Sequence, residues 1–394
     1  MVPESNVVAL DIIPEPAEII ARAAALVPAL RARSQECERL RHIPAQTIAD
    51  FRDAGFYRMA QPKPFGGYAM GMDTVVEVAM QIGRACGSSA WMAGQYPGHQ
   101  FMVGFFPQEA QQEYWGGNPD TLSSTASAVA RLNFEPERGG WRIRDSQMRF
   151  SSGCDWAEWI LFVTKEGTAL VPKSDFRVLD DWHVAGLRGT GSKSIVIEDA
   201  WIPPHRFVPM QDLRNGTTHG ARLYPDMPFY RAPQTMVLHQ LLLAPQIGMA
   251  RGILELFEER VTKRIDLHTG RPASEGAGAQ LRFAEAAAEV DAAEMFIRRN
   301  CAKLLDWGTS GHLPDDNERA LMRRDITYAG LLAVRAAERL LGAGDASGMF
   351  DAHPIARLGR DLHMANLHAT QTWDEPAQTY SRLRWGLPAS SLLN

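Results

Sequence analysis

The second half of the chain, from Pro233 onward, consists of long Ala-rich segments with helical periodicity. Apolar residues recur at three- and four-residue spacing, which is the pattern of amphipathic helices. The segments span residues 234–266, 276–307, 315–342 and 354–382, and short stretches with glycine or proline separate them. Because such helices bury their apolar faces against one another, the sequence predicts an antiparallel four-helix bundle over residues 229–394.

Residues 15–107 show the same helical spacing, with breaks at Pro44 and at Gly66-Gly67. The sequence therefore predicts an N-terminal helical domain over residues 1–118. One apolar run begins at Trp91 and continues past Pro97-Gly98, which predicts a buried helix with a break at the proline. His99 follows this break. On spacing alone it is open whether His99 lines a cavity or caps a helix fragment.

Between these helical regions the chain changes to short runs of strand-forming residues, such as 159–163 and 194–197. This change predicts a middle β-domain over residues 119–228, so the fold class is mainly α with a central β-domain. Three loops in this region, 123–125, 150–153 and 186–192, are rich in small hydrogen-bonding residues. Their hydroxyl and backbone N–H groups suit polar heterocycles and phosphates, although turn chemistry accounts for each loop taken singly.

The composition favours a globular protein whose partners are small molecules. Of 394 residues, 45% are hydrophobic and 22% are charged, which is enough to bury a large core. A net charge of -5 without a basic cluster argues against nucleic-acid binding. No apolar run approaches the roughly 18 residues of a membrane span, so we expect a cytoplasmic protein without a membrane partner. The sequence contains neither a GxGxxG dinucleotide motif nor a GxSxG nucleophile motif.

The stretch from Arg360 to Tyr380 combines a carboxylate with two histidines and is predicted to be the last helix and its exit. Asp361 and His368 are seven residues apart and share one helix face, whereas His363 projects about 140° away from His368. A metal site with both histidines is therefore disfavoured. The four cysteines lack CxxC spacing, so we predict no metal at all. From this stretch alone, His368 is equally well read as a packed interior histidine or as a reactive group.

The order of helical domain, β-domain and bundle resembles the acyl-CoA dehydrogenase fold over nearly the whole chain. Three motifs resemble more closely the oxygenase components of two-component, flavin-dependent aromatic hydroxylases: 150–155, 182–192, and Arg360-Asp361 followed by His368. The resemblance implies a middle domain that is β-barrel-like. It also implies a homotetramer in which bundle helices pair across subunits and help to complete the flavin site.

The activity implied by the resemblance is the hydroxylation of a small aromatic or heteroaromatic substrate. In such enzymes a separate reductase supplies reduced flavin, here FMN or FAD, and O2 is the co-substrate. The flavin hydroperoxide that forms transfers its terminal oxygen to an electron-rich ring. The alternatives are an acyl-CoA dehydrogenase-type oxidoreductase, an N-oxidising monooxygenase of the same fold, and a non-catalytic flavin binder. Glu375 lies near the position of the catalytic glutamate of the dehydrogenases, but its sequence context resembles the hydroxylases.

The same resemblance implies roles for individual residues. The residues matched to the flavin are Ser124, Thr125, Ser152, Trp182, Arg188, Ser192 and Arg264. The catalytic residues are His368, Ser152 and Asp361, and the substrate-binding residues are His99 and Trp91. Arg264 would pair with the flavin phosphate. His368 would transfer a proton, and Asp361, acting through a water molecule, would favour its protonated form. Ser151 would point away from the flavin because neighbours on a strand face opposite sides.

Overall fold

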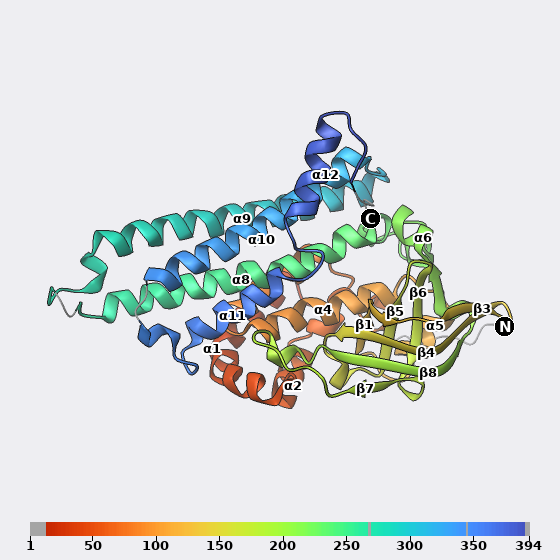
Figure 1. The fold of residues 1–394 in the computed structure, drawn as a ribbon. Coiled ribbons are helices and arrows are strands. Elements are labelled where there is room, and N and C mark those ends of the chain that lie inside the picture. Colours follow the sequence, from red (N-terminus) through yellow and green to blue (C-terminus); the bar gives the residue numbers. More distant parts are fainter. Residues whose placement is uncertain (1–12, 267–268, 344–345, 391–394) are drawn as a thin grey trace.

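The computed structural model describes residues 13–266, 269–343 and 346–390 (Figure 1). The first part of the chain is helical, as predicted. Its helices are α1 (Pro16–Leu40), α2 (Ala45–Asp53), α3 (Met72–Gly83), α4 (Gly87–Val103) and α5 (Gln108–Trp115).

The predicted break at Pro97 is wrong, because α4 continues through the proline from Gly87 to Val103. Every residue of α4 except Gln95 is buried. Packing on all sides therefore outweighs the one backbone hydrogen bond that a proline removes from a helix. His99 consequently lies inside a continuous helix rather than at the start of a fragment.

The middle region forms strands, as predicted, but they make two sheets rather than a barrel-like domain. The strands are β1 (Ser123–Ala126), β2 (Ala128–Arg131), β3 (Phe134–Glu137), β4 (Gly140–Ser151), β5 (Trp159–Val163), β6 (Gly167–Pro172), β7 (Arg177–Leu179), β8 (Lys193–Ile202) and β9 (Phe207–Pro209). One sheet has the order β1-β5-β6-β9, with β1 parallel to β5; the other has the order β2-β4-β8-β7, with β3 also paired to β4. No strand of the described residues closes either sheet on itself.

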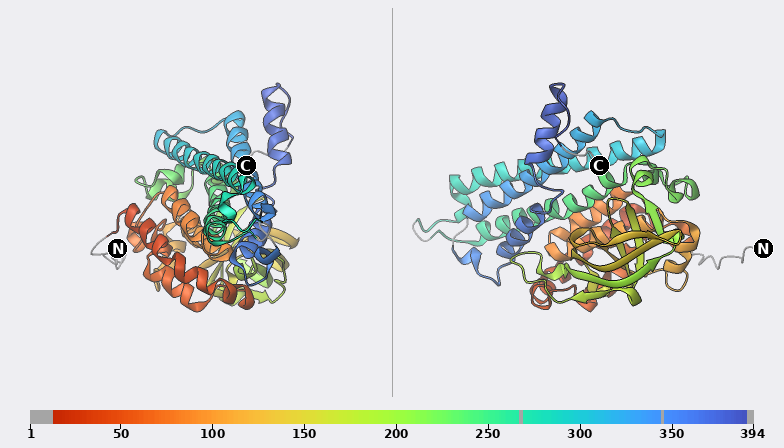
Figure 2. Two further views of the ribbon diagram at one scale, coloured as in Figure 1. Left: turned by 90° about the vertical axis from the view of Figure 1, so that its left-hand side faces the viewer. Right: turned by 45° about the vertical axis from the view of Figure 1, so that its right-hand side comes forward.

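Two short helices, α6 (Met210–Asn215) and α7 (His219–Leu223), lead from the sheets to the bundle. The bundle contains α8 (Gln234–Lys263), α9 (Ala277–Ser310), α10 (Asp316–Ala343) and α11 (Pro354–Asn366), and α12 (Asp374–Arg384) projects from it in Figures 1 and 2. The single helix predicted over 354–382 is wrong. Pro376 has no backbone N–H, so it fits only in the first turn of a helix, and α12 starts two residues before it.

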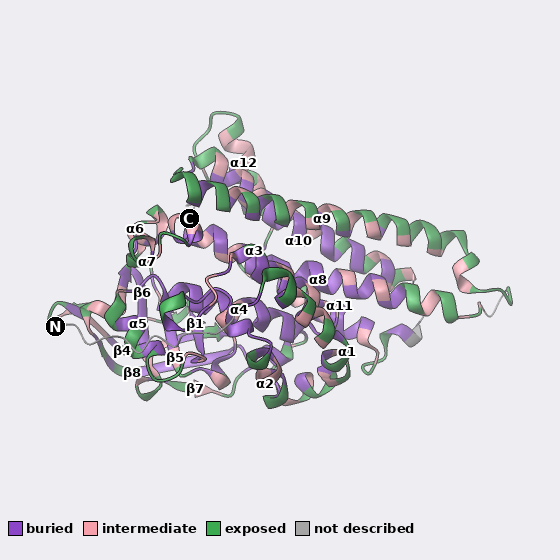
Figure 3. Ribbon diagram, turned by 180° about the vertical axis from the view of Figure 1, so that it is seen from behind, coloured by how far each residue is buried: buried purple, intermediate pink, exposed green. Residues whose placement is uncertain are grey.

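Helix α4 lies between the bundle and the sheets, and both sheets lie beside it and α5 (Figures 1 and 2). Helices α3, α4 and α8 are largely buried, whereas the outer side of α9 is exposed (Figure 3). Gly83 of α3 and Gly248 of α8 allow these two helices to touch, since a Cβ on Gly83 would lie 2.7 Å from the Gly248 Cα. α4 also packs closely on α8, since a Cβ on Gly94 would lie 2.9 Å from a backbone carbonyl oxygen of α8, and it contacts β1 through His99, whose Nδ1 lies 2.7 Å from a carbonyl oxygen of that strand.

Candidate active site

A chain of hydroxyl groups links α4 to the loop before β8. The Trp91 indole N–H donates to the Ser152 Oγ at 3.1 Å, and the Ser152 and Ser192 hydroxyls lie 2.7 Å apart. Ser192 lies 2.6 Å from the Thr190 hydroxyl, which donates to the Leu187 carbonyl at 2.8 Å. The structure therefore joins the second and third predicted loops through their side chains.

The direction of this hydroxyl chain is fixed by its end at Leu187. A carbonyl only accepts hydrogen bonds, so the Thr190 proton points to Leu187 and the Thr190 oxygen accepts from Ser192. Ser192 in turn accepts from Ser152. The proton of Ser152 is thereby committed, and its remaining lone pair makes it an acceptor toward a ligand. Ser124, on β1, donates its hydroxyl proton to the Ser152 carbonyl at 2.8 Å and holds the two segments together.

Neighbouring Ser151 ends β4 and is fully buried, and its Oγ has no hydrogen-bond partner. Phe150 precedes Ser151 in β4, and its φ of 62° is in the left-handed region. The residue is 57% exposed, and its ring centroid lies 6.0 Å from that of Trp182. A bulky residue in this conformation is a sign of functional constraint.

Asp361 supports the loop that carries the hydroxyl chain. Its carboxylate accepts from the Leu187 backbone N–H at 2.6 Å, and the Trp182 indole N–H donates to the Leu187 carbonyl at 3.1 Å. Burial, followed by the nearby Cys86, raises the pKa of Asp361 to about 8. α11 approaches α4 closely, because a Cβ on Gly87 would lie 2.6 Å from the Asp361 Cβ.

The predicted link from Asp361 to His368 is wrong, because His368 lies beyond the end of α11 and not on its face. The His368 Nδ1 bonds Thr370, 3.3 Å from its backbone N and 2.9 Å from its Oγ1. Burial, with a smaller effect from the charge of Arg323, lowers the pKa of His368 to about 4. The ring is therefore neutral at pH 7, opposite to the protonated form that was predicted.

Trp91 connects His368 to the hydroxyl chain. The two ring centroids are 5.9 Å apart, while the Trp91 N–H is bonded to Ser152. His363, in contrast, is half exposed, and its Nε2 lies 3.6 Å from a carboxylate oxygen of Glu338. The structure thus brings His368, Trp91 and Ser152 together and directs His363 elsewhere.

His99 has both ring nitrogens engaged. Its Nδ1 lies 2.7 Å from the Ser123 carbonyl oxygen, so this nitrogen carries the proton, and its Nε2 lies 2.7 Å from the Thr125 hydroxyl. Burial lowers the pKa of His99 to about 4. A neutral ring with this tautomer accepts the Thr125 proton, which fixes the orientation of that hydroxyl beside Ser124.

Arg264 and Arg188 do not join this group of residues. Arg264 caps the C-terminal end of α8, which lies at the end of the bundle away from the sheets in Figures 1 and 2. Arg188 is exposed, and its Nε donates to the Val184 carbonyl at 2.7 Å within its own loop. Glu375 is exposed in the first turn of α12 and accepts from Thr379 at 3.0 Å.

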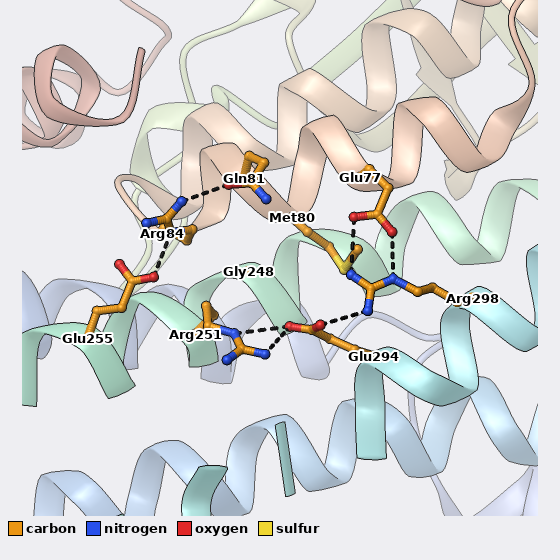
Figure 4. A pocket seen from close by; sticks show the side chains of 9 residues that line it. All are labelled: Glu77, Met80, Gln81, Arg84, Gly248, Arg251, Glu255, Glu294 and Arg298. Atoms are coloured by element: carbon orange, nitrogen blue, oxygen red, sulfur yellow. Dashed lines mark hydrogen bonds and ion pairs between the residues drawn. The ribbon is translucent and has the colours of Figure 1, made fainter. Parts of the chain in front are cut away.

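A charged cleft of about 220 Å³ lies elsewhere, between α3, α8 and α9 (Figure 4). Its lining includes three arginines, each of which is ion-paired. Arg84 lies 2.7 Å from Glu255, Arg251 lies 2.5 Å from Glu294, and Arg298 lies 2.7 Å from Glu77. The remaining lining residues are Met80, Gln81 and Gly248. Within the described part of the chain, no group of three or more His, Cys, Asp and Glu side chains is arranged to hold a metal ion.

Comparison with known proteins assigns the family. The N-terminal and C-terminal domain models of acyl-CoA dehydrogenase match residues 18–117 and 241–373. The chain is 31% identical to the flavin-dependent monooxygenase oxygenase subunit HsaA of Rhodococcus jostii over 94% of this chain and 98% of that protein. It is also 31% identical to the oxygenase component of the FADH2-dependent resorcinol hydroxylase of a Rhizobium species, over 92% and 94% of the two chains. The chain belongs to the oxygenase components of two-component, flavin-dependent aromatic hydroxylases.

A solved structure supports this assignment. The crystal structure of the 3-HSA hydroxylase from Rhodococcus sp. RHA1 is 30% identical, with a TM-score of 0.90 over 96% of this chain and 99% of that one. The oxygenase component uses reduced flavin and an aromatic substrate, and a separate reductase is its partner. No helix among the described residues is long and apolar enough to cross a membrane.

The side chains of this hydroxylase fit a flavin at the ends of β1 and β4. The edge of a reduced flavin ring carries N–H donors, and the hydroxyl oxygens of Ser152 and Thr125, whose own protons go to Ser192 and His99, are acceptors that match these donors. The exposed ring of Phe150 provides a flat apolar surface at the same place.

Sequence reasoning missed Thr190 and Phe150. It also missed Arg323 and His239, which lie beside His368: the Arg323 Nη1 donates to the His239 Nδ1 at 2.8 Å and to the carbonyl oxygen of the threonine that bonds His368 at 2.9 Å. Thr190 and Phe150 lie inside two of the quoted motifs, so the motifs themselves were the signal. Arg323 and His239 lie on α10 and α8, and nothing in the local sequence distinguishes them from other helix residues.

Proposed function

We propose that this hydroxylase binds reduced flavin across the ends of β1 and β4, and that His368 faces the aromatic substrate. The observation that carries the proposal is the position of Trp91, which bonds Ser152 through its N–H and packs against His368 with its ring. Flavin and substrate thus meet on two sides of one indole. When bound, the reduced flavin supplies the activation of O2 and the oxygen atom that enters the substrate ring.

His368 holds a proton at its Nε2 atom in this proposal. Its Nδ1 accepts from the Thr370 backbone N–H, so the neutral ring carries its proton on the other nitrogen. That N–H donates to an oxygen of the substrate or of the reacting O2. Because the pKa of His368 is about 4, the group acts as a hydrogen-bond donor over the whole neutral range.

Ser152 accepts a hydrogen bond from the flavin, and Ser124 and Ser192 fix its position. His99 acts through Thr125, whose hydroxyl it orients, rather than by contacting the substrate itself. Trp182 closes the loop beneath the site through its bond to the Leu187 carbonyl.

The decisive experiment mixes the purified protein with reduced FMN or reduced FAD under anaerobic conditions and then adds O2. An oxygenase gives a long-lived oxygen-dependent flavin absorbance, and an added aromatic substrate shortens its lifetime and is hydroxylated. A dehydrogenase would instead bleach oxidised flavin on addition of an acyl-CoA. The exposed position of Glu375 on α12 favours the first outcome.

We further propose a cytoplasmic homotetramer in which Arg264 binds the phosphate of flavin held mainly by a neighbouring subunit. The support is its place at the end of the bundle away from the sheets. Arg264→Ala should weaken binding of reduced flavin by about 1.5–3 kcal/mol, the scale of a lost charge-assisted hydrogen bond. Light scattering measures the assembly, and a fully active monomer at micromolar concentration would contradict the proposal.

A further inference from the structure

Arg323, on α10, carries a charge that the described part of the chain does not pair. Its guanidinium is mostly enclosed, and burial lowers its pKa without removing its charge at neutral pH. The charge of Glu375 acts on Arg323 in the opposite direction to burial, with the smaller effect on its pKa. Because a charge that is largely removed from water is normally paired, a half-buried arginine beside His368 without a carboxylate partner among the residues that the structure describes indicates a ligand.

The hydrogen bonds of Arg323 show which ring nitrogen of His239 carries the proton. Its Nη1 donates to the His239 Nδ1 at 2.8 Å and to the Thr370 carbonyl at 2.9 Å. A guanidinium has no lone pair to offer, so the His239 Nδ1 accepts and the proton of that ring lies on Nε2. Burial, followed by the charge of Arg323, lowers the pKa of His239 well below its usual range. His239 and His368 are therefore both neutral, and both present an Nε2–H group.

All the groups that remain for a ligand in this cluster are hydrogen-bond donors. They are the two Nε2–H groups and the Nε and Nη2 of Arg323, which have no acceptor among the described residues and are not fully enclosed. We propose that Arg323, together with His239 and His368, binds an anionic oxygen of the aromatic substrate. This inference rests on the proposed function, because it places the substrate at His368.

A negative charge on the substrate oxygen would favour hydroxylation. An electrophilic oxygen attacks an electron-rich ring, and a phenolate is more electron-rich than a phenol. The anionic oxygen therefore has two possible sources: a substrate phenol that ionises in the site, or a carboxylate that the substrate already carries. Both place one negative oxygen at Arg323, and they differ in which small molecules bind.

Three probes separate these sources: resorcinol, which is a neutral phenol in solution; indole-3-acetate, which has a carboxylate and no phenol; and p-hydroxyphenylacetate, which has both. Their affinities for the full-length protein are measured by equilibrium dialysis, without flavin. A carboxylate site binds the two acids and rejects their methyl esters. A phenolate site binds resorcinol, and the bound probe shows the red-shifted ultraviolet absorbance of an ionised phenol.

The test compares Arg323→Gln with Arg324→Gln. Arg324 is the next residue on α10, but its guanidinium is bonded to the Asp325 carboxylate at 2.5 Å and stacks on Tyr380. Arg323→Gln should weaken binding of the preferred probe by roughly ten- to a hundredfold, as for a lost charge-assisted hydrogen bond. Arg324→Gln should leave it within about twofold, and Arg323→Lys, which keeps the charge, should recover part of the loss.

The inference is overturned if Arg323→Gln binds all three probes as tightly as the wild-type protein, if Arg324→Gln causes the same loss, or if the wild-type protein binds none of them. Its failure is distinguishable from failure of the proposed function, which is measured by the oxygen-dependent flavin absorbance in the absence of substrate. That absorbance does not require Arg323. A protein that shows the absorbance but fails the binding comparison loses only this inference.

Discussion

Two arginine-containing regions of this hydroxylase differ in how their charges are compensated. In the cleft between α3, α8 and α9, the guanidinium groups of Arg84, Arg251 and Arg298 all lie on glutamates of the same protein (Figure 4). Beside His368, the neighbours of Arg323 are a neutral imidazole and a carbonyl. The cleft is hollow, but each of its guanidinium groups is paired with a carboxylate, whereas Arg323 has no carboxylate partner among the described residues. Unsatisfied donors are the stronger indication of a ligand.

The same contrast holds for the titratable groups around the site. Asp361 and His368 are buried without a partner of opposite charge, and their pKa values move so that both are neutral near pH 7. An arginine cannot respond in this way.

His368→Ala should slow hydroxylation by roughly 10²–10⁴, the usual scale for a lost proton donor, because it removes the Nε2–H group. Flavin binding should remain. His363→Ala is the matched control, since that side chain is half exposed beside Glu338 and should change turnover less than about twofold. Single-turnover hydroxylation with reduced flavin measures both variants. Loss of turnover in His363→Ala with normal turnover in His368→Ala would contradict the site.

The sequence predicted the elements better than the contacts between them. Helical and strand periodicity located the bundle and the sheets. Of the motif at 150–153, Ser152 joins the hydroxyl chain and Ser151 is buried without a hydrogen-bond partner. Pro376 was an available signal that a separate helix, α12, starts near it, while Pro97 was a misleading signal because packing holds α4 together. The bonds of Asp361 to Leu187 and of Arg323 to His239 join residues far apart in the chain, and no local pattern encodes them.

Asp361→Asn should remove a loss of stability that accumulates as pH rises toward 8. The folded-state pKa of about 8 lies above the ordinary value of 3.8, so between these values the unfolded chain has released the proton and the folded chain has not; stability falls over this range and levels off above pH 8. Between pH 6.5 and 8 the wild-type protein should lose about 2 kcal/mol from this group. The asparagine of the variant keeps an acceptor for the Leu187 N–H but does not titrate, so the variant should not lose this stability.

Urea unfolding at pH 6.5, 7.2 and 8 measures this difference. Over this range histidines with lowered pKa values, including His99, His239 and His368, raise stability as pH rises, because about half of each imidazole is protonated in the unfolded chain at pH 6.5. They do so equally in wild type and in Asp361→Asn, so the difference between the two proteins reports on Asp361. Asp361→Ala is the second variant, and it should be destabilised at every pH by about 1–3 kcal/mol, since the Leu187 N–H loses its partner. Equal pH dependence in Asp361→Asn and wild type would show that the carboxyl is not neutral in the fold.

Ser152→Ala should shorten the lifetime of the oxygen-dependent flavin absorbance by about tenfold. This factor corresponds to the loss of one hydrogen bond of about 1.4 kcal/mol. Ser151→Ala should leave it unchanged, because that hydroxyl is buried without a partner and does not reach the hydroxyl chain. Stopped-flow absorbance after mixing with O2 measures both. The reverse result would place the flavin on the other face of β4.

Glu294→Ala should have the smallest effect on stability and activity, and it tests the charged cleft between α3, α8 and α9. Glu294 is ion-paired to two arginines, at 2.5 Å from Arg251 and 2.9 Å from Arg298, but both guanidinium groups keep other carboxylates, Asp291 and Glu77. Pairs that are partly exposed contribute little each, so the free energy of unfolding in urea should fall by about 1 kcal/mol. Probe binding and turnover per folded molecule should stay at the wild-type level, because the cleft holds no group that the reaction uses. A variant of full stability with lost turnover would reassign the cleft as a functional site and reverse the contrast with Arg323.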